Sequence, residues 1–452
     1  MQVIVRKNCM HTRRQFLGGL AAGFALPLWA QPAADFSLRI EAASLQLGQK
    51  KSIKTIAYNG SAPGPLLRVP QGKRFTVDVE NRTANPEIVH WHGLLGSSAM
   101  DGAMEEGSPM IAAGGRLRYE LQAEPSGLRW YHTHTFAGAD TSRGQYTGQH
   151  GVLFVEPAHD QGRYDAEAFL VLQDWDGRMM GGGDGAMNPV YGVSTINGRM
   201  LGFGEPLRVR EHDRLLLHIL NASPTEVHWI AMAGHAFEVL ELDGNPVPKP
   251  QSVPMLRLAP AERVCAVVTM GNPDVWVLGE VRRHIQVAGM GMVIEYAGAT
   301  GQPRWQQPET LQWNYEIFGE SGPTADLPPH EIPLVFQSKF QGHGAMEKWT
   351  INGKSYPDVA SPRLVAGERY RLRFQNKSKD DHPIHLHRHR FELAQLPGVA
   401  SMPRGIVKDT VLVPGNAEVC VDFTADNPGD TLLHCHQQDH MDRGFMMVFH
   451  YA

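Results

Sequence analysis

The sequence predicts an all-β protein built from three tandem Greek-key β-sandwich domains. Short runs of alternating apolar and polar residues are separated by Pro, Gly and Asn, a pattern typical of antiparallel sandwiches. The same order of motifs also recurs three times along the chain. Recurrence at this spacing indicates repeated structural units, so we expect one sandwich per repeat.

Each repeat opens with an Asn-Gly pair, continues through a Pro-containing segment, and reaches a strand that ends in Asn. The pairs are Asn59-Gly60, Asn197-Gly198 and Asn352-Gly353, and the strands end at Asn81, Asn221 and Asn376. The second halves of the repeats match over residues 116–134, 262–280 and 418–436. This alignment predicts domains at residues 35–157, 166–298 and 330–452, preceded by a leader at residues 1–34.

Length and composition are those of a globular protein. The 452 residues exceed one ordinary domain, and 42% hydrophobic with 20% charged residues is a common balance. The net charge of −5 gives no electrostatic reason to expect nucleic acid or an anionic membrane as a partner. The four cysteines, Cys9, Cys265, Cys420 and Cys435, imply no disulfide framework.

The leader resembles a twin-arginine signal peptide. Arg13 and Arg14 precede an apolar, Gly-containing run over residues 16–30 that is too short to span a membrane stably. Such signals direct export of proteins that have already folded. We therefore expect cleavage between Ala30 and Ala34, and a soluble periplasmic protein with no membrane segment in its mature form.

Residues with metal-ligand character concentrate near the C-terminus, in the stretch 433–440. In an extended strand, side chains alternate between faces, so His434 and His436 share one face and Cys435 lies on the other. A thiolate with two imidazoles makes the trigonal site of blue copper, and His440 is one candidate imidazole. The two histidines on the opposite face would then belong to a different metal centre.

Three further stretches carry His-x-His pairs, each of which places two imidazoles on one face of a strand. The pairs are His90 with His92, His132 with His134, and His385 with His387, the last preceded by His382. Four such pairs, one of them flanking a cysteine, are difficult to explain as solvated surface. The pairs fall in the first and third repeats, which predicts a metal cluster where those two domains meet.

The middle repeat has no such pair at the corresponding positions. Its second half carries residues 275–279, Val-Trp-Val-Leu-Gly, where the other repeats carry ligands. His228 and His235 are spaced unlike a ligand pair, and we interpret them as ordinary polar or core histidines. The middle domain is therefore expected to be free of copper and to set the geometry of its neighbours.

The four motifs together resemble the copper motifs of the multicopper oxidases, the laccase-like family, and the resemblance runs from Phe36 to the C-terminus. It implies cupredoxin-like domains and four copper ions: one type 1, one type 2 and two type 3. By this resemblance the ligands are His382, Cys435 and His440 for type 1; His90 and His385 for type 2; His92, His132 and His436 for one type 3 ion; and His134, His387 and His434 for the other. His389 matches no ligand position.

The residue expected at the axial position of the type 1 site departs from many bacterial relatives. The family often places Met ten residues after the cysteine, whereas this chain has Phe445. Phe cannot coordinate, so the copper should be effectively three-coordinate, with a raised potential. A shift of one residue would instead bring Met446 to this position, and both readings stay open.

Oxygen reduction consumes protons, so an acid near the cluster is expected. Asp101 matches the family's acid after the first His pair, although Asp-Gly is also a common turn. The family's second acid lies three or six residues after the cysteine, where this chain has Gln438 and Met441. Asp439 is adjacent but is expected to face elsewhere, which leaves the second proton route in doubt.

The resemblance implies an oxidase that takes four single electrons from a small reducing substrate, passes them from Cys435 to His434 and His436, and reduces O₂ to water. Phe445 and the absence of a long Met-rich insert in the third domain favour phenols and aromatic amines as substrates. A cuprous or other metal oxidase for copper tolerance is the alternative, supported by 19 Met, including Met179, Met180 and Met187 in a flexible loop. A copper-free cell-envelope binding protein is an alternative of another class, but the ligand positions are filled. We expect a monomer.

Overall fold

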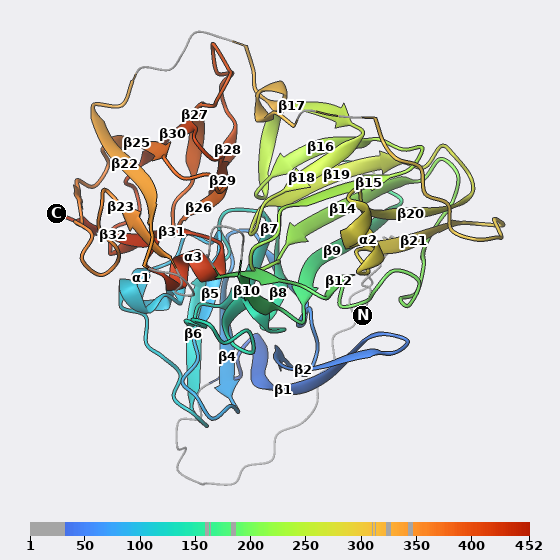
Figure 1. Cartoon of the computed structure of the whole chain (residues 1–452), viewed down its shortest axis with the longest axis horizontal. Helices are drawn as coiled ribbons and strands as arrows, with labels where there is room; N and C mark the ends of the chain where they lie inside the picture. Colours follow the sequence, from blue (N-terminus) through green and yellow to red (C-terminus); the bar gives the residue numbers. More distant parts are fainter. Residues whose placement is uncertain are drawn as a thin grey trace, which may run out of the picture.

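The computed structural model describes residues 32–158, 162, 164–181, 187–309, 311, 313–321, 327–341 and 347–452. Strands dominate these residues, and each helix is only a turn or so long, which confirms the all-β prediction. Three pairs of sheets form three units, with one small hairpin beside them (Figure 1). Apart from its last three residues, the predicted leader lies outside the described residues. No helix in the described part of the chain is long and apolar enough to cross a membrane.

The first unit is a pair of four-stranded sheets with strand orders β2-β1-β4-β6 and β3-β8-β7-β5. Its strands are β1 Phe36–Gly48, β2 Lys51–Tyr58, β3 Leu67–Pro70, β4 Arg74–Asn81, β5 Val89–His92, β6 Arg116–Gln122, β7 Gly127–Thr133 and β8 His150–Glu156. Alternate residues of β4, including Val77 and Val79, are fully buried between the two sheets, as the sandwich pattern predicts.

The middle unit pairs a six-stranded sheet, β12-β9-β14-β19-β16-β17, with a five-stranded sheet, β13-β21-β20-β15-β18. Its strands are β9 Ala166–Trp175, β12 Val193–Ile196, β13 Leu207–Val209, β14 Arg214–Asn221, β15 His228–Met232, β16 Phe237–Leu242, β17 Asn245–Val253, β18 Met255–Leu258, β19 Arg263–Thr269, β20 Val275–Glu280 and β21 Gly291–Tyr296. Strands β14 and β19 are buried along almost their whole length. Leu220 at the end of β14 packs against the first unit, whereas Leu216, Cys265 and Val267 form a small separate cluster.

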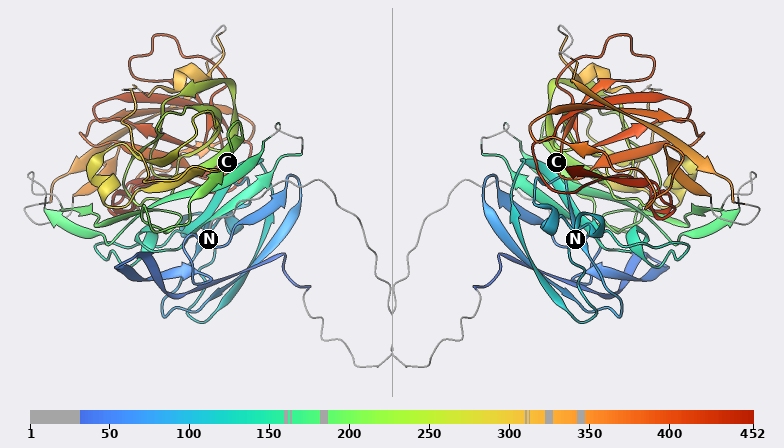
Figure 2. Two further views of the ribbon diagram at one scale, coloured as in Figure 1. Left: turned by 90° about the vertical axis from the view of Figure 1, so that its right-hand side faces the viewer. Right: turned by 90° about the vertical axis from the view of Figure 1, so that its left-hand side faces the viewer.

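The third unit repeats this plan, with sheet orders β23-β22-β25-β30-β27-β28 and β24-β32-β31-β26-β29. Its strands are β22 His330–Lys339, β23 Lys348–Ile351, β24 Arg363–Leu364, β25 Arg369–Asn376, β26 His382–Leu386, β27 Phe391–Gln395, β28 Val407–Lys408, β29 Thr410–Val413, β30 Glu418–Thr424, β31 Thr431–Cys435 and β32 Met446–Tyr451. The middle and third units pack together on one side of the first unit, which is blue to cyan in Figure 2.

The repeated Asn-Gly pairs make the same turn in each unit. Asn59, Asn197 and Asn352 all have φ of 52–53°, and each is followed by a glycine with positive φ. Each asparagine side chain accepts a hydrogen bond from a backbone N–H of the unit's first strand, at 2.7–2.8 Å. Asparagine tolerates the left-handed conformation and can make this local bond, which explains its recurrence.

Short elements connect the strands. They are α1 Ser98–Asp101, η1 Met104–Glu106, η2 Gly144–Tyr146, α2 Arg283–Val287, η3 Tyr315–Phe318, α3 Gln438–Asp442, and the hairpin strands β10 Arg178–Gly181 and β11 Met187–Val190. The sequence predicted the Met-containing segment to be a loop, but its two ends form a hairpin in which β10 and β11 pair from Arg178 opposite Val190 to Gly181 opposite Met187. Residues 182–186 at its tip lie outside the described part of the chain.

Candidate copper centres

Strand pairing brings the predicted histidines together. In the first unit, β5 and β7 align His90 opposite His132. In the third unit, β26 and β31 align His385 opposite His434, with Ile384 opposite Cys435. Alternation then places one set of side chains from each strand pair at the contact between the two units.

Eight buried histidines from the two units meet there, and we call them the histidine cluster. They are His90, His92, His132, His134, His385, His387, His434 and His436. Rings from the two units stack on each other, with centroids 4.0 Å apart for His90 and His387 and 3.7 Å apart for His92 and His385. The predicted contact of the first and third units at the His pairs is therefore present.

Within the cluster, buried ring nitrogens converge in groups of three, which include the predicted type 3 set of His134, His387 and His434 but also mixed sets such as His90, His92 and His132. The Nε2 atom of His434 lies 3.0 Å from that of His387 and 3.5 Å from that of His134, so these three form one compact group. The ring of His436 lies 5.2 Å from the rings of both His92 and His132. His90 and His385 complete the set, with ring centroids 5.8 Å apart.

The hydrogen bonds of the cluster leave nitrogens free on its inner side. His132, His385 and His434 donate from Nδ1 to backbone carbonyls at 2.8–2.9 Å. A ring that donates from one nitrogen presents a lone pair on the other. Buried nitrogens without a hydrogen-bond partner among the described residues include Nε2 of His90, His132, His385 and His436, and Nδ1 of His92.

Burial also favours the neutral form of the His385 and His134 rings. It lowers the pKa of His385 to about 3, an effect that the charge of Asp409 only partly offsets, and it lowers the pKa of His134 to about 3. Neutral imidazole is the form that binds a metal ion. Convergent, neutral and unpartnered nitrogens fit metal ions, and imidazole ligands suit copper.

A second group, the thiolate site, consists of His382, Cys435 and His440. The Cys435 Sγ atom lies 3.8 Å from Nδ1 of His382 and 3.6 Å from Nδ1 of His440, and the two nitrogens are 3.2 Å apart. All three residues are buried. His382 donates from Nε2 to the Ser378 hydroxyl at 2.9 Å, which turns its Nδ1 toward the sulfur. One thiolate and two imidazoles in a triangle fit a blue copper ion.

Phe445, rather than Met446, borders the thiolate site. The Phe445 ring lies 4.8 Å from the ring of His382 and 6.5 Å from that of His440. Met446 pairs with His434 across β31 and β32 and packs in a separate apolar cluster with Leu432. Phe445 directly precedes β32, so the side chains of Phe445 and Met446 point to different faces of the extended chain, as alternation requires.

Asp101 lies against the histidine cluster. Its Oδ2 atom is 2.7 Å from Nδ1 of His387 and 3.1 Å from Nδ1 of His90, and its backbone carbonyl accepts a 2.8 Å hydrogen bond from His90. The carboxyl is buried, so this aspartate is more than a turn residue. It touches one predicted type 2 ligand and one predicted type 3 ligand.

Sequence reasoning missed Glu106, a second buried carboxyl beside Asp101. One Glu106 oxygen accepts the Leu432 N–H at 2.6 Å and lies 3.6 Å from Nδ1 of His387. Burial, with the neighbouring charge of Asp101, raises the pKa of Glu106 well above its ordinary value. A search for acids by their spacing from Cys435 could not find it, because η1 lies far from β31 in sequence. Its proximity to Asp101 in sequence was the available signal.

The two positions predicted for a second acid have other roles. The Gln438 side chain accepts the Gln145 N–H at 2.9 Å and donates to the Thr135 carbonyl at 3.2 Å, which fastens α3 to the first unit. Met441 is buried in an apolar cluster. Asp439 pairs with Arg443 at 3.2 Å.

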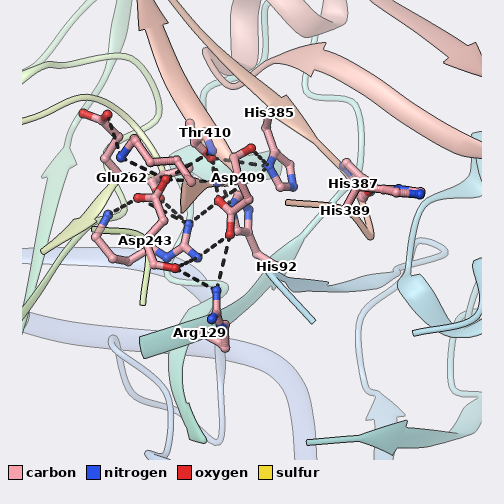
Figure 3. Close-up of polar contacts among 12 residues, drawn as sticks. His92, Arg129, Asp243, Glu262, His385, His387, His389, Asp409 and Thr410 are labelled. Atoms are coloured by element: carbon pink, nitrogen blue, oxygen red, sulfur yellow. Dashed lines mark hydrogen bonds and ion pairs between the residues drawn. The ribbon is translucent and has the colours of Figure 1, made fainter. Parts of the chain in front are cut away.

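Sequence reasoning also missed Asp409, a buried carboxylate beside the histidine cluster. It lies between β28 and β29, with one carboxylate oxygen 3.2 Å from Nε2 of His92 (Figure 3). Its backbone carbonyl accepts the His385 bond already described. The only sequence signal was a charged pair, Lys408 and Asp409, directly before the apolar strand β29.

Three other described histidines, His228, His235 and His389, have both ring nitrogens engaged. His228 lies 2.9 Å from Asp174 and 3.0 Å from Glu280, and His235 bonds the Ala233 carbonyl and the Tyr296 hydroxyl. His389 donates to the His387 carbonyl and bonds the Tyr451 hydroxyl. None of these three rings has a nitrogen left for a metal ion.

Comparison with known proteins places the chain in a family. Three sequence models, each describing a multicopper oxidase, match residues 39–160, 169–288 and 328–452. The multicopper oxidase MmcO of Mycobacterium tuberculosis is 29% identical, over 96% of this chain and 95% of its own length. Laccase-4 of Thanatephorus cucumeris is 25% identical, over 84% and 82%.

Solved structures share the cupredoxin-like fold. Fet3p, a multicopper oxidase that functions in iron import, matches with a TM-score of 0.77 at 21% identity, over 92% of this chain and 90% of its own. A multicopper oxidase from Pseudomonas thermotolerans matches with a TM-score of 0.73 at 24% identity, over 93% and 100%. The chain belongs to the multicopper oxidase family, whose members are copper-dependent oxidoreductases with O₂ as electron acceptor.

Proposed function

We propose that this protein couples four one-electron oxidations of phenols or aromatic amines to the reduction of O₂ to two waters. The observation that carries the proposal is the covalent link between the two groups of ligands. Cys435 belongs to the thiolate site, while its chain neighbours His434 and His436 both belong to the histidine cluster. An electron received at the sulfur thus reaches either half of the cluster through one residue.

Four copper ions would occupy the two groups and supply the redox chemistry, with one type 1 ion at the thiolate site and one type 2 and two type 3 ions at the histidine cluster. The ligand sets are those expected from the family motifs. The chain's part is to hold neutral imidazoles and one thiolate in a buried, water-poor setting. Fixed ligand geometry favours one-electron exchange at the thiolate site with little rearrangement.

Asp101 is proposed to deliver protons to the histidine cluster. Its carboxyl touches two ligand rings from opposite units, so it lies beside the place where oxygen atoms would need protons. Glu106, which lies next to it, is the nearest described carboxyl that could extend this route toward η1.

Oxygen uptake by purified holoprotein tests the proposed function. We expect blue absorption, about four copper ions per chain, and O₂ consumption with a phenol in a ratio of about four substrate electrons per O₂. Uptake driven by Cu(I) or Fe(II) but not by phenols would favour the metal oxidase alternative. A folded protein that takes up no copper would favour the copper-free binding protein.

We also propose the domain boundaries, the export route and the oligomeric state of the enzyme. The three units of the fold are proposed to be domains at residues 35–157, 166–298 and 330–452, with copper bound by the first and third. The leader at residues 1–34 is proposed to direct a monomeric protein to the periplasm by the twin-arginine route. Fractionation of cells that express the full chain, with and without the change Arg13→Lys plus Arg14→Lys, tests the export step.

A further inference from the structure

A buried network of charged residues joins all three units beside the histidine cluster (Figure 3). The first unit contributes Arg129 on β7, and the third unit contributes Asp409 between β28 and β29. The middle unit contributes Asp243 and Arg263, from the turn before β17 and the start of β19. All four side chains are fully buried.

The centre of this network is a bidentate ion pair across units. Arg263 Nη1 and Nη2 each lie 2.6 Å from one oxygen of the Asp409 carboxylate. A planar guanidinium held by two parallel bonds fixes both the place and the orientation of its partner. Arg129 adds a second cation 3.5 Å from the same carboxylate.

Arg263 is itself held rigidly. Its remaining N–H groups donate to the carbonyls of Leu128, Ala261 and Asp243, at 3.1–3.3 Å. Asp243 also receives the Lys408 ammonium at 2.9 Å, so the residue next to Asp409 is tied to the middle unit as well. The carboxylate of Asp409 therefore has little freedom to turn.

The Asp409 residue in turn holds two rings of the histidine cluster. Its Oδ1 accepts a bond from His92 Nε2 at 3.2 Å, which leaves Nδ1 of that ring free on the inner side. Its backbone carbonyl accepts a bond from His385 Nδ1 at 2.8 Å, which leaves Nε2 free. The Thr410 hydroxyl donates to Oδ1 at 3.0 Å and lies within 3.4 Å of both rings.

The backbone beside His92 is shaped to admit the ion pair. Gly93 has φ of +85°, and a Cβ atom there would lie 2.8 Å from Arg263 Nη2 and 2.9 Å from Asp409 Oδ2. Any side chain at this position would collide with both partners of the pair. The strand that carries His92 and the ion pair from the other two units thus fit directly against each other.

We propose that Arg263 and Asp409 are positioning residues for the cluster, through which the middle unit orients His92 and His385. The middle unit, which holds no predicted copper ligand, would then be required to assemble the type 2 centre and the adjoining type 3 centre. The inference rests on the proposed function, in which these two histidines bind copper. Asp409, which the middle unit holds in place, fixes the tautomers of the His92 and His385 rings.

The test compares two equivalent Arg→Lys changes in the full-length protein. Arg263→Lys keeps the buried charge but loses the bidentate geometry. Arg371→Lys is the matched control, because Arg371 also makes a bidentate pair, with Asp422 at 2.7 and 2.8 Å, on the six-stranded sheet of the third unit. Copper-free protein is titrated with copper, while blue absorption reports the thiolate site and electron paramagnetic resonance reports type 2 copper.

We expect Arg263→Lys to weaken copper binding at the histidine cluster about 10–100-fold and to alter the type 2 resonance, with unchanged blue absorption. The Arg371→Lys control should match wild type in all three readouts. Wild-type affinity and resonance in Arg263→Lys, or an equal loss in Arg371→Lys, would overturn the inference. Wild-type protein that binds no copper at the cluster would instead refute the proposed function.

A milder variant covers the case in which Arg263→Lys does not fold. Thr410→Val replaces the hydroxyl by a methyl group of similar size and removes one donor to Asp409 Oδ1. The carboxylate is then less constrained, so cluster affinity should fall while blue absorption stays constant. Cluster affinity equal to wild type in folded Thr410→Val would count against the positioning role.

Discussion

Asp101 joins the first and third units, because its Oδ2 atom lies 2.7 Å from Nδ1 of His387 although 286 positions separate the two residues in sequence. The same oxygen is 3.1 Å from Nδ1 of His90 in the first unit. One carboxylate therefore touches ligand rings from both sides of the cluster. This position suits a group that delivers protons to the histidine cluster and also one that orients the two rings.

Replacing Asp101 by Asn should separate these two roles. The amide keeps an oxygen for the ring N–H groups but cannot release a carboxyl proton. We expect Asp101→Asn to retain copper and blue absorption, while reoxidation by O₂ slows about 10²-fold or more. Stopped-flow absorption of the reduced enzyme mixed with O₂ measures this rate. Normal reoxidation across the acid range would show that Asp101 only orients the rings.

Removal of the thiol should abolish the blue colour without removing copper from the histidine cluster. Cys435 supplies the sulfur of the thiolate site, and the rings of its chain neighbours His434 and His436 lie in the histidine cluster. Cys435→Ser is therefore expected to lose blue absorption and phenol oxidation while copper remains bound by the histidine cluster. Visible spectra with copper analysis check this outcome, and unchanged absorption would remove Cys435 from the type 1 site.

His228 in the middle unit should make stability depend on pH. Burial disfavours its charged form, but the charges of Asp174 and Glu280 outweigh this effect and raise the pKa of His228 to about 9. The other charges nearby are Arg282, which pairs with Glu280, and Glu226. The folded protein thus keeps a proton that the unfolded chain loses above its ordinary pKa of 6.5. The stabilisation is complete below pH 6.5 and is lost as pH rises toward 9, with a magnitude on the order of 3 kcal/mol.

The variant His228→Gln isolates that contribution from other titrating groups. Gln cannot take up a proton, so its two buried carboxylate neighbours lose their cation at every pH. We expect the difference in unfolding free energy between wild type and His228→Gln to be largest at pH 6 and to shrink by pH 9. Urea unfolding at several pH values measures it, and a difference that does not vary with pH would contradict the charged state of His228.

The fold and the gathering of the His pairs at one contact could be predicted because both depend on local patterns. Alternation along a strand fixes which residues share a face, so His434 and His436 could be separated from Cys435 by sequence alone. The Asn-Gly turns at Asn59, Asn197 and Asn352 likewise follow from the conformational tolerance of those residues. Each of these inferences needs only a few neighbouring residues.

The residues that hold the ligands could not be predicted in this way. Arg263 and Asp409 are 146 positions apart and come from different units, so no spacing in the sequence relates them. Glu106 reaches the cluster because η1 contacts β31 of the third unit, which is a property of how the units pack. Such contacts depend on the orientation of whole sheets, and the repeat pattern does not specify that orientation.

Phe445 borders the thiolate site, so it is expected to affect the type 1 potential and hence which substrates the enzyme can oxidise. Its ring lies against His382 and stacks on Trp349, at centroid distances of 4.8 and 5.7 Å, and it offers no lone pair to copper. A thioether there would stabilise the oxidised ion and lower the potential. Phe445→Met should therefore lower the type 1 potential, and each drop of about 59 mV reduces the equilibrium for electron transfer about tenfold.

Met446→Leu is the control for this prediction, since Met446 packs with Leu432 and Met441 and not with the thiolate site. Leu fills a similar volume without a sulfur atom, so the potential should stay nearly unchanged. Redox titration of both variants measures the potentials, and oxidation rates for a series of phenols test the consequence. Poorly reducing phenols should slow more than easy donors in Phe445→Met, because their driving force is smallest. A large shift in Met446→Leu with none in Phe445→Met would place the sulfur of Met446 at the copper and reverse the assignment.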